Sequence, residues 1–146
     1  MEKFPSLAGQ PEFFLMNQLV LMREGVRRIE VMQDAVKGLT DEDILALASH
    51  FSKLPAKASG EKIDAELVKR GEVLSAQLRC GSCHLPTLAG QEQMPRLARQ
   101  RIDYMIHSMK EFRDNKRSGA DTAMTAVVFG VLDRDIEALA HYAAQR

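Results

Sequence analysis

The chain has 146 residues, 45% of them hydrophobic, and its 20 Lys and Arg residues balance its 20 Asp and Glu residues. This length allows one domain of ordinary size or two small ones, and the apolar content suffices for a buried core. The balanced charge argues against nucleic acid or an anionic membrane as the main partner, no apolar run reaches the roughly 20 residues that span a bilayer, and the start, MEKFPSLAGQ, lacks a signal-peptide pattern.

Helical periodicity predicts an all-α fold, and no segment shows the alternation of a β-strand. Residues 12–24 place their apolar side chains on one broad face. Thr40 is a predicted N-cap, with Asp43 in the first turn of a second helix that ends before Pro55. The segment PAKASGEK at residues 55–62 is small, polar and interrupted by Pro and Gly, which is typical of a linker.

The linker divides the chain into two predicted units, residues 1–54 and residues 63–146. In the second unit, an apolar stripe over residues 63–78 leads directly into LRCGSCHLP, which holds both cysteines of the chain. A further helix is predicted after Pro95, and the last helix covers residues 133–144.

The two units resemble each other in sequence, which indicates a tandem duplication. PSLAGQPEFFLMNQL in the first unit aligns without gaps on PRLARQRIDYMIHSM in the second, and GLTDEDILALASH aligns on GVLDRDIEALAHY. Between these blocks, REGVRRIEVM matches RDNKRSGADTAM with two residues inserted, which pairs Met32 with Met124. The first unit has no counterpart of residues 63–84, so it is an incomplete copy of the second.

Cys80, Cys83 and His84 form a C-x-x-C-H motif. Two thiols one helical turn apart can form thioethers with the two vinyl groups of a haem, and the adjacent imidazole can reach the iron from one side. This motif is therefore typical of covalent attachment of a c-type haem.

Two other interpretations of the cysteines remain open at this stage. A redox dithiol of the thioredoxin type needs a strand leading into a helix, whereas here the preceding segment is predicted to be a helix. A zinc site needs a second pair of ligands at a familiar spacing, and the remaining histidines, His50, His107 and His141, provide none.

A second iron ligand would be a His or a Met that reaches the opposite face of the haem. Met124 is the leading candidate, because it follows a polar turn in a stretch predicted to be non-helical and has a repeat equivalent in Met32. Met105 and Met109 lie on the apolar face of a predicted helix and are better explained as core residues.

The second unit resembles class I c-type cytochromes in its Gly-bearing first helix, KRGEVLSAQLRCGSCH, a Pro soon after the motif, a Met loop and a C-terminal helix. The phrases PSLAGQ, MREGVRR and LTDEDILALA are similar to those of the periplasmic tandem two-haem cytochromes c. The resemblance implies tandem cytochrome c-like modules, the first incomplete, joined by the linker at residues 55–62.

The resemblance also implies roles for individual residues, as follows. Cys80 and Cys83 would hold the haem, His84 and Met124 would ligate the iron, the carbonyl of Pro95 would accept a hydrogen bond from His84, and Leu97, Tyr104 and Phe112 would line the haem pocket. Gly71 would permit a close crossing of the first and last helices of the module, against Leu139 and Tyr142.

This sequence departs from the family pattern in three places. Leu85 stands where a Gly usually follows the motif, and the longer loop leaves Pro86 as an alternative partner for His84. The first module lacks a C-x-x-C-H motif. Either a segment upstream of Met1 carries a second motif and a second haem, which we favour, or the module has lost its haem.

The expected function is electron transfer by an electron carrier rather than an enzyme, with one covalent haem c in this chain and redox proteins as partners. By resemblance, the location is the periplasm. One alternative is a cytochrome subunit permanently bound to a periplasmic dehydrogenase or oxidase complex, and a homodimer is also open. Another alternative is a haem-free binding module whose cysteines are simple thiols.

Overall fold

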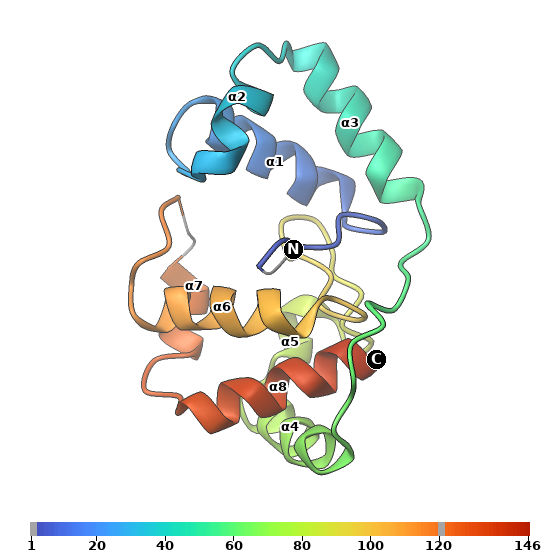
Figure 1. Cartoon of the computed structure of the whole chain (residues 1–146), viewed down its shortest axis with the longest axis vertical. Helices are drawn as coiled ribbons and strands as arrows, with labels where there is room; N and C mark the ends of the chain where they lie inside the picture. The colour runs from blue at the N-terminus through green and yellow to red at the C-terminus, as the bar shows by residue number, and fades with distance from the viewer. Residues whose placement is uncertain (1–2, 120–121) are drawn as a thin grey trace.

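Helices joined by loops make up the protein in the computed structural model, which describes residues 3–119 and 122–146 (Figure 1). The helical elements, in chain order, are α1 (Glu12–Arg23), η1 (Glu30–Met32, a single 3-10 turn), α2 (Gln33–Val36), α3 (Asp41–Lys53), α4 (Ala65–Gln77), α5 (Gly81–His84), α6 (Ile102–Arg113), α7 (Thr122–Val127) and α8 (Asp133–Gln145). No β-strand occurs within the described ranges, so the prediction of an all-α fold is confirmed.

The start of α3 follows from its sequence. The side chain of Thr40 accepts a hydrogen bond from the backbone N–H of Asp43 at 3.1 Å, and the carboxylate of Asp43 accepts one from the N–H of Thr40 at 2.9 Å. This reciprocal capping satisfies two N–H groups that the first turn would otherwise leave unpaired. The helix ends at Lys53, two residues before Pro55, because the residue that precedes a proline avoids helical geometry.

Helices α4 and α8 cross at close range in the lower part of Figure 1. A Cβ atom placed on Gly71 of α4 would overlap the carbonyl oxygen of Ala138 and lie 2.6 Å from Cβ of Tyr142. The predicted crossing is therefore present, with Ala138 rather than Leu139 at the tightest contact. Only a glycine lets the two backbones approach this closely, and this contact fixes the helix that leads into the cysteine motif.

The sequence repeat corresponds to a repeat of contacts. The guanidinium of Arg23 donates to the carbonyl of Leu39 at 3.2 Å, and the equivalent Arg113 donates to the carbonyl of Val131 at 3.0 Å. Equivalent apolar side chains are also buried in both halves: Val36 and Val128, Ile44 and Ile136, Ala48 and Ala140. In the three-dimensional structure, α1 corresponds to α6 and α3 to α8.

The main difference between the halves is the surroundings of α3. In α8, Ala138 is fully buried beneath α4. Its equivalent in α3, Ala46, is exposed, because α3 packs chiefly against α1 among the described residues. The first module therefore has the α1–α3 pair without a counterpart of α4, as the incomplete repeat predicts.

Two glutamines join the halves in a nearly twofold arrangement. Gln10 donates to the carbonyl of Arg96 at 3.1 Å and accepts from the N–H of the same residue at 2.8 Å. Gln100 donates to the carbonyl of Ser6 at 3.0 Å and accepts from its N–H at 2.7 Å. Gln10 and Gln100 occupy equivalent positions in the repeat, as do Ser6 and Arg96, so each half binds the other in the same way.

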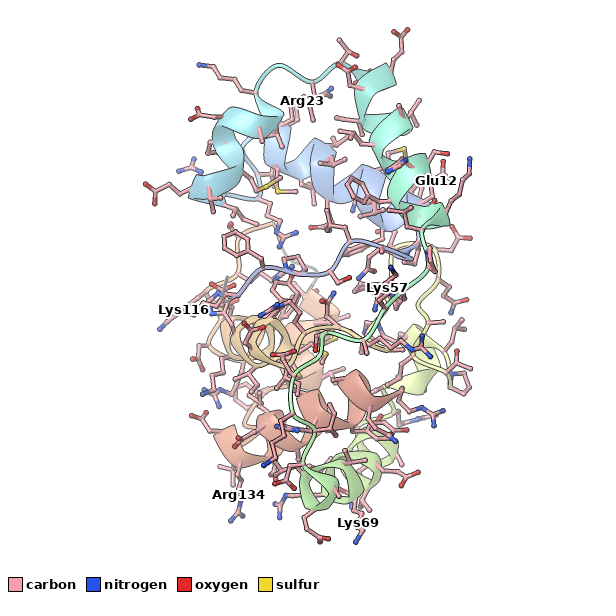
Figure 2. All side chains as sticks on the ribbon, turned by 45° about the vertical axis from the view of Figure 1, so that its right-hand side comes forward. Glu12, Arg23, Lys57, Lys69, Lys116 and Arg134 are labelled. Carbon is pink, nitrogen blue, oxygen red and sulfur yellow. The ribbon has the colours of Figure 1, made fainter. Side chains whose placement is uncertain are left out.

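The segment that connects the halves runs beside both of them. Figure 2 shows Lys57 of this segment between Glu12 and Arg23 of the first half and Lys69 and Arg134 of the second. No helix lies between Leu54 and Asp64, in agreement with the predicted linker. The assignment of residues 1–54 and 63–146 as modules stays a prediction.

Candidate haem-attachment site

The cysteine motif occupies one helical turn that follows shortly after α4, which ends at Gln77. The backbone N–H of Cys80 donates to the carbonyl of Ser75 at 3.0 Å, and the N–H of His84 donates to the carbonyl of Cys80 at 3.0 Å. This i, i+4 bond closes a single turn that begins at Cys80 and ends at His84, with α5 inside it. The geometry places two sulfur atoms about one turn apart and the imidazole next to them.

The cysteines do not have the surroundings of a redox-active dithiol. No disulfide joins them in the described structure, and Cys80 is half-buried whereas Cys83 is exposed. Burial raises the pKa of the Cys80 thiol, although a hydrogen bond with Ser75 opposes it. Reactive dithiols instead have a lowered pKa. In addition, no group of three or more His, Cys, Asp and Glu side chains within residues 3–119 and 122–146 could hold a metal ion.

His84 has one imidazole nitrogen in a hydrogen bond and the other without a hydrogen-bond partner among the described residues. Its side chain is 4% exposed, and its Nδ1 lies 2.8 Å from the carbonyl oxygen of Pro95. A carbonyl can only accept, so Nδ1 carries the proton and Nε2 carries a lone pair. Burial lowers the pKa of His84, while the hydrogen bond to Pro95 opposes this effect. Its Nε2 is buried and has no hydrogen-bond partner in the described part of the chain, which fits a nitrogen that ligates haem iron.

The structure therefore distinguishes between the two candidate partners of His84. Pro95 makes the contact, whereas the carbonyl of Pro86 lies 3.5 Å from the guanidinium of Arg146. The loop that brings Pro95 to the histidine depends on Gly90, where a Cβ atom would lie 2.5 Å from the backbone nitrogen of Arg96. No larger residue fits there without movement of the backbone.

Leu85 has the conformation that explains why a Gly is usual at this position. Its φ is +70°, in the region that a side chain disfavours, and its ψ is +155°. A non-glycine residue in such a conformation costs on the order of 1 kcal/mol or more. The chain accepts this cost because the turn after His84 must reverse direction, as the hydrogen bond from the N–H of Gly90 to the carbonyl of His84 at 3.0 Å shows.

Met124 lies in α7, so the prediction of a non-helical stretch at this position is wrong. Its side chain is half-buried. Met105 is buried at 4% exposure and Met109 packs against the same apolar cluster, as expected of core residues. Leu97 packs against this cluster together with Cys80, so two of the predicted site residues share one neighbourhood.

Tyr104 and Phe112 lie elsewhere along α6. Tyr104 lines a cavity between the halves together with Arg27 of the first module and Arg117 of the second. Burial acts to raise the pKa of Tyr104, but the charges and hydrogen bonds of these two arginines outweigh burial and lower it. Phe112 lies under the guanidinium of Arg117, 4.7 Å from ring centroid to Cζ. The structure thus places Tyr104 at the junction of the halves, and its role in lining a haem pocket stays a prediction.

Arg27 is not among the site residues predicted from the sequence. It is buried, and its guanidinium donates to Oε1 of Gln18 at 2.6 Å. The repeat contained the relevant signal, because Arg27 aligns with Arg117, whose guanidinium donates to the hydroxyl of Ser108 at 2.8 Å. Arg117 and Ser108 stand at the repeat positions of Arg27 and Gln18.

The remaining histidines have ordinary contacts. Nδ1 of His141 accepts the backbone N–H of Asp64 at 3.1 Å. His107 lies 3.5 Å from Glu111 on the surface of α6, and His50 packs edge-on against Phe51. None of these contacts resembles the environment of His84.

Comparison with known proteins gives a consistent result. The family model for cytochrome c matches residues 68–145, more than half of the chain. Cytochrome c4 of Stutzerimonas stutzeri is 31% identical over 159 residues, which cover 95% of this chain and 75% of the relative. The thiosulfate dehydrogenase electron acceptor of Thiomonas intermedia is 32% identical, with 97% and 70% covered.

Solved structures agree with this assignment. The crystal structure of reduced recombinant cytochrome c4 from Pseudomonas stutzeri matches with a TM-score of 0.89 and 29% identity over 98% of this chain and 85% of that one. Cytochrome c4 of Acidithiobacillus ferrooxidans matches with a TM-score of 0.87 and 25% identity over 99% and 89%. The chain belongs to the cytochrome c family, is similar to cytochrome c4, and is an electron-transfer protein with covalently bound haem c.

Proposed function

We propose that Cys80 and Cys83 form the thioethers to haem c, that His84 and Met124 are its axial ligands, and that the protein carries single electrons between redox proteins of the periplasm. The observation that carries this proposal is the buried Nε2 of His84, which has no hydrogen-bond partner among the described residues and lies one helical turn after Cys80. When bound, the haem supplies a one-electron couple between ferric and ferrous iron.

The residues around the haem would restrict it to electron transfer and prevent the binding of a substrate to the iron. Pro95 fixes the orientation of the imidazole of His84 through a 2.8 Å hydrogen bond. Ligation by both His84 and Met124 would leave no open position for a substrate, and a thioether ligand favours a relatively high reduction potential. These properties suit a carrier that exchanges electrons at the haem edge.

The haem attachment can be tested on the intact protein. We expect acid–acetone extraction to leave the colour with the polypeptide, because thioether bonds survive this treatment. We also expect the mass of the intact protein to exceed that of the polypeptide by one haem. The Cys80→Ser, Cys83→Ser double variant serves as the control and should release any haem that it binds. Complete extraction of the colour from the wild-type protein would disprove the assignment of the motif.

Relatives support the identity of the partner class. Two of them, from Thiomonas intermedia and Stutzerimonas stutzeri, are named thiosulfate dehydrogenase electron acceptors. A dehydrogenase that releases electrons one at a time is therefore the proposed donor, and a terminal oxidase is a proposed acceptor. No helix in the described parts of the chain has the length and apolar character needed to cross a membrane.

A permanent subunit is the second candidate function. A solved structure of thiosulfate dehydrogenase (TsdBA) from Marichromatium purpuratum matches 97% of this chain with a TM-score of 0.79 and 27% identity. The match covers 32% of the chain in that structure. The first module also presents several large apolar side chains to solvent: Phe4, Leu7, Phe13, Val26, Val31 and Leu45. At about 25 cal/mol for each Å² of apolar surface, burying these side chains against a partner would stabilise the complex by several kcal/mol.

These exposed apolar side chains predict the oligomeric state of the purified protein. We expect light scattering to show a dimer or a complex with a partner, because association would remove this surface from water. If an upstream segment completes the first module with a second C-x-x-C-H motif, the protein should instead bind two haems and be monomeric. A monomer with one haem, no upstream motif and no binding of a hydrophobic dye would contradict both versions.

A further inference from the structure

Gln10 belongs to the first module, yet it contacts the peptide group that orients the iron ligand of the second. The carbonyl of Pro95 accepts from Nδ1 of His84 at 2.8 Å, and the N–H of Arg96 belongs to the same peptide group. That N–H donates to Oε1 of Gln10 at 2.8 Å. Hydrogen bonds therefore connect three groups in series: the side-chain oxygen of Gln10, the Pro95–Arg96 peptide and the imidazole of His84.

The orientation of the Gln10 amide follows from its partners. The N–H of Arg96 can only donate and the carbonyl of Arg96 can only accept, so Oε1 faces the first and Nε2 the second, at 2.8 and 3.1 Å. Gln10 is 3% exposed and Arg96 is 4% exposed, so water does not compete for these groups. The backbone of Gly90 packs directly against the same peptide group. A Cβ atom at this position would lie only 2.6 Å from the carbonyl carbon of Pro95.

Hydrogen bonds in series strengthen one another. A peptide whose N–H donates to Gln10 carries more negative charge on its carbonyl oxygen, so it accepts more strongly from Nδ1–H of His84. A stronger acceptor makes the imidazole more electron-rich, as it does for metal-ligating histidines in general. An electron-rich ligand stabilises ferric iron relative to ferrous iron and lowers the reduction potential.

We propose that Gln10 is a positioning residue for the haem of the second module and that it tunes the reduction potential through the Pro95–Arg96 peptide and His84. This inference rests on the proposed role of His84 as an iron ligand. It assigns the first module a function at a site that it does not itself contain.

The nearly twofold interface provides a matched control. Gln100 makes the equivalent pair of bonds to Ser6, at 3.0 and 2.7 Å, and is 2% exposed. Its partner peptides across the interface are those of Ser6 in the first module, whereas the partner of His84 is the carbonyl of Pro95. Gln10→Leu and Gln100→Leu therefore each remove a reciprocal pair of hydrogen bonds across the same interface, and Gln100→Leu also removes the bond from the N–H of Arg101 at 3.0 Å. Only Gln10→Leu interrupts the series of hydrogen-bonded groups that leads to the imidazole.

The experiment measures the midpoint potential and the exchange rate of the Nδ1–H proton of His84 in the holoprotein. We expect Gln10→Leu to raise the potential and to speed the exchange of this proton, because the Pro95 carbonyl becomes a weaker acceptor. Gln100→Leu should leave both values near those of the wild type. Equal shifts in the two variants, or no shift in Gln10→Leu, would overturn the inference.

A second pair of variants covers the case in which Gln10→Leu fails to take up haem. Gln10→Glu, when ionised, keeps and strengthens an acceptor for the N–H of Arg96 but loses the donor to the carbonyl of Arg96. Gln100→Glu loses the equivalent donor to the carbonyl of Ser6 and adds the same charge. The potential of Gln10→Glu should therefore still fall below that of Gln100→Glu. Equal potentials in this pair would also refute the role of Gln10. The proposed function fails separately, if the spectrum of the wild-type protein shows no histidine-ligated covalent haem.

Discussion

Met124→Ala should abolish the sulfur-to-iron charge-transfer band of the oxidised protein and lower its reduction potential by on the order of tenths of a volt, given that axial ligands set haem potentials over a range of about 0.8 V. The physical reason is that a thioether stabilises ferrous iron better than water or a second nitrogen ligand does. The measurement is an absorption spectrum of the oxidised variant followed by a redox titration.

Two other methionines provide the controls for this experiment. Met105 and Met109 belong to the core between α6 and α8. Their replacement by Ala should leave the band in place and should reduce the free energy of unfolding by about 2–5 kcal/mol at the more buried Met105. A band that persists in Met124→Ala would assign the distal ligand to another residue.

Gly71→Ala should destabilise the protein strongly, although Ala is a better helix former than Gly. The added Cβ would overlap the carbonyl oxygen of Ala138, so α4 must move away from α8. We expect a loss of about 2–3 kcal/mol in the free energy of unfolding, since forcing atoms into a packed contact costs about 1–3 kcal/mol and here the neighbour is rigid backbone. Urea denaturation of the holoprotein measures this loss.

Gly38→Ala is the matched control, because a Cβ atom at Gly38 has no neighbour within 4 Å. Gly38→Ala should change the free energy of unfolding by no more than about 0.5 kcal/mol. Since α4 leads into Cys80, Gly71→Ala should also lower the fraction of the protein that acquires haem. Equal stabilities of the two variants would mean that α4 and α8 do not cross at Gly71.

The sequence predicted those parts of the fold that depend on local patterns. The N-cap at Thr40, the helices on either side of residues 55–62 and the C-x-x-C-H turn all follow from residues that are close together in the chain. The short helix at Met124 was missed because TAMTAV is too brief to show a helical period. Its stability depends on α6, against which it packs.

The contacts around the site were harder to predict because they join residues of the first module to residues of the second. The neighbours of Tyr104 include Arg27, which is far away in the sequence and could not be predicted from local patterns. Gln10 occupies a polar loop in which a glutamine carries no sequence signal of its own. Its partner becomes evident only when the equivalent residue Gln100 and the reciprocal contacts are compared.

The paired glutamines also determine how the two halves can move. One attachment point between two bodies acts as a pivot, whereas two separated points around an axis resist rotation. Gln10 and Gln100 provide two such points, each with a pair of hydrogen bonds. The two pairs of hydrogen bonds therefore resist rotation of one module relative to the other. A redox partner docked on the first module would stay at a constant distance from a haem in the second module.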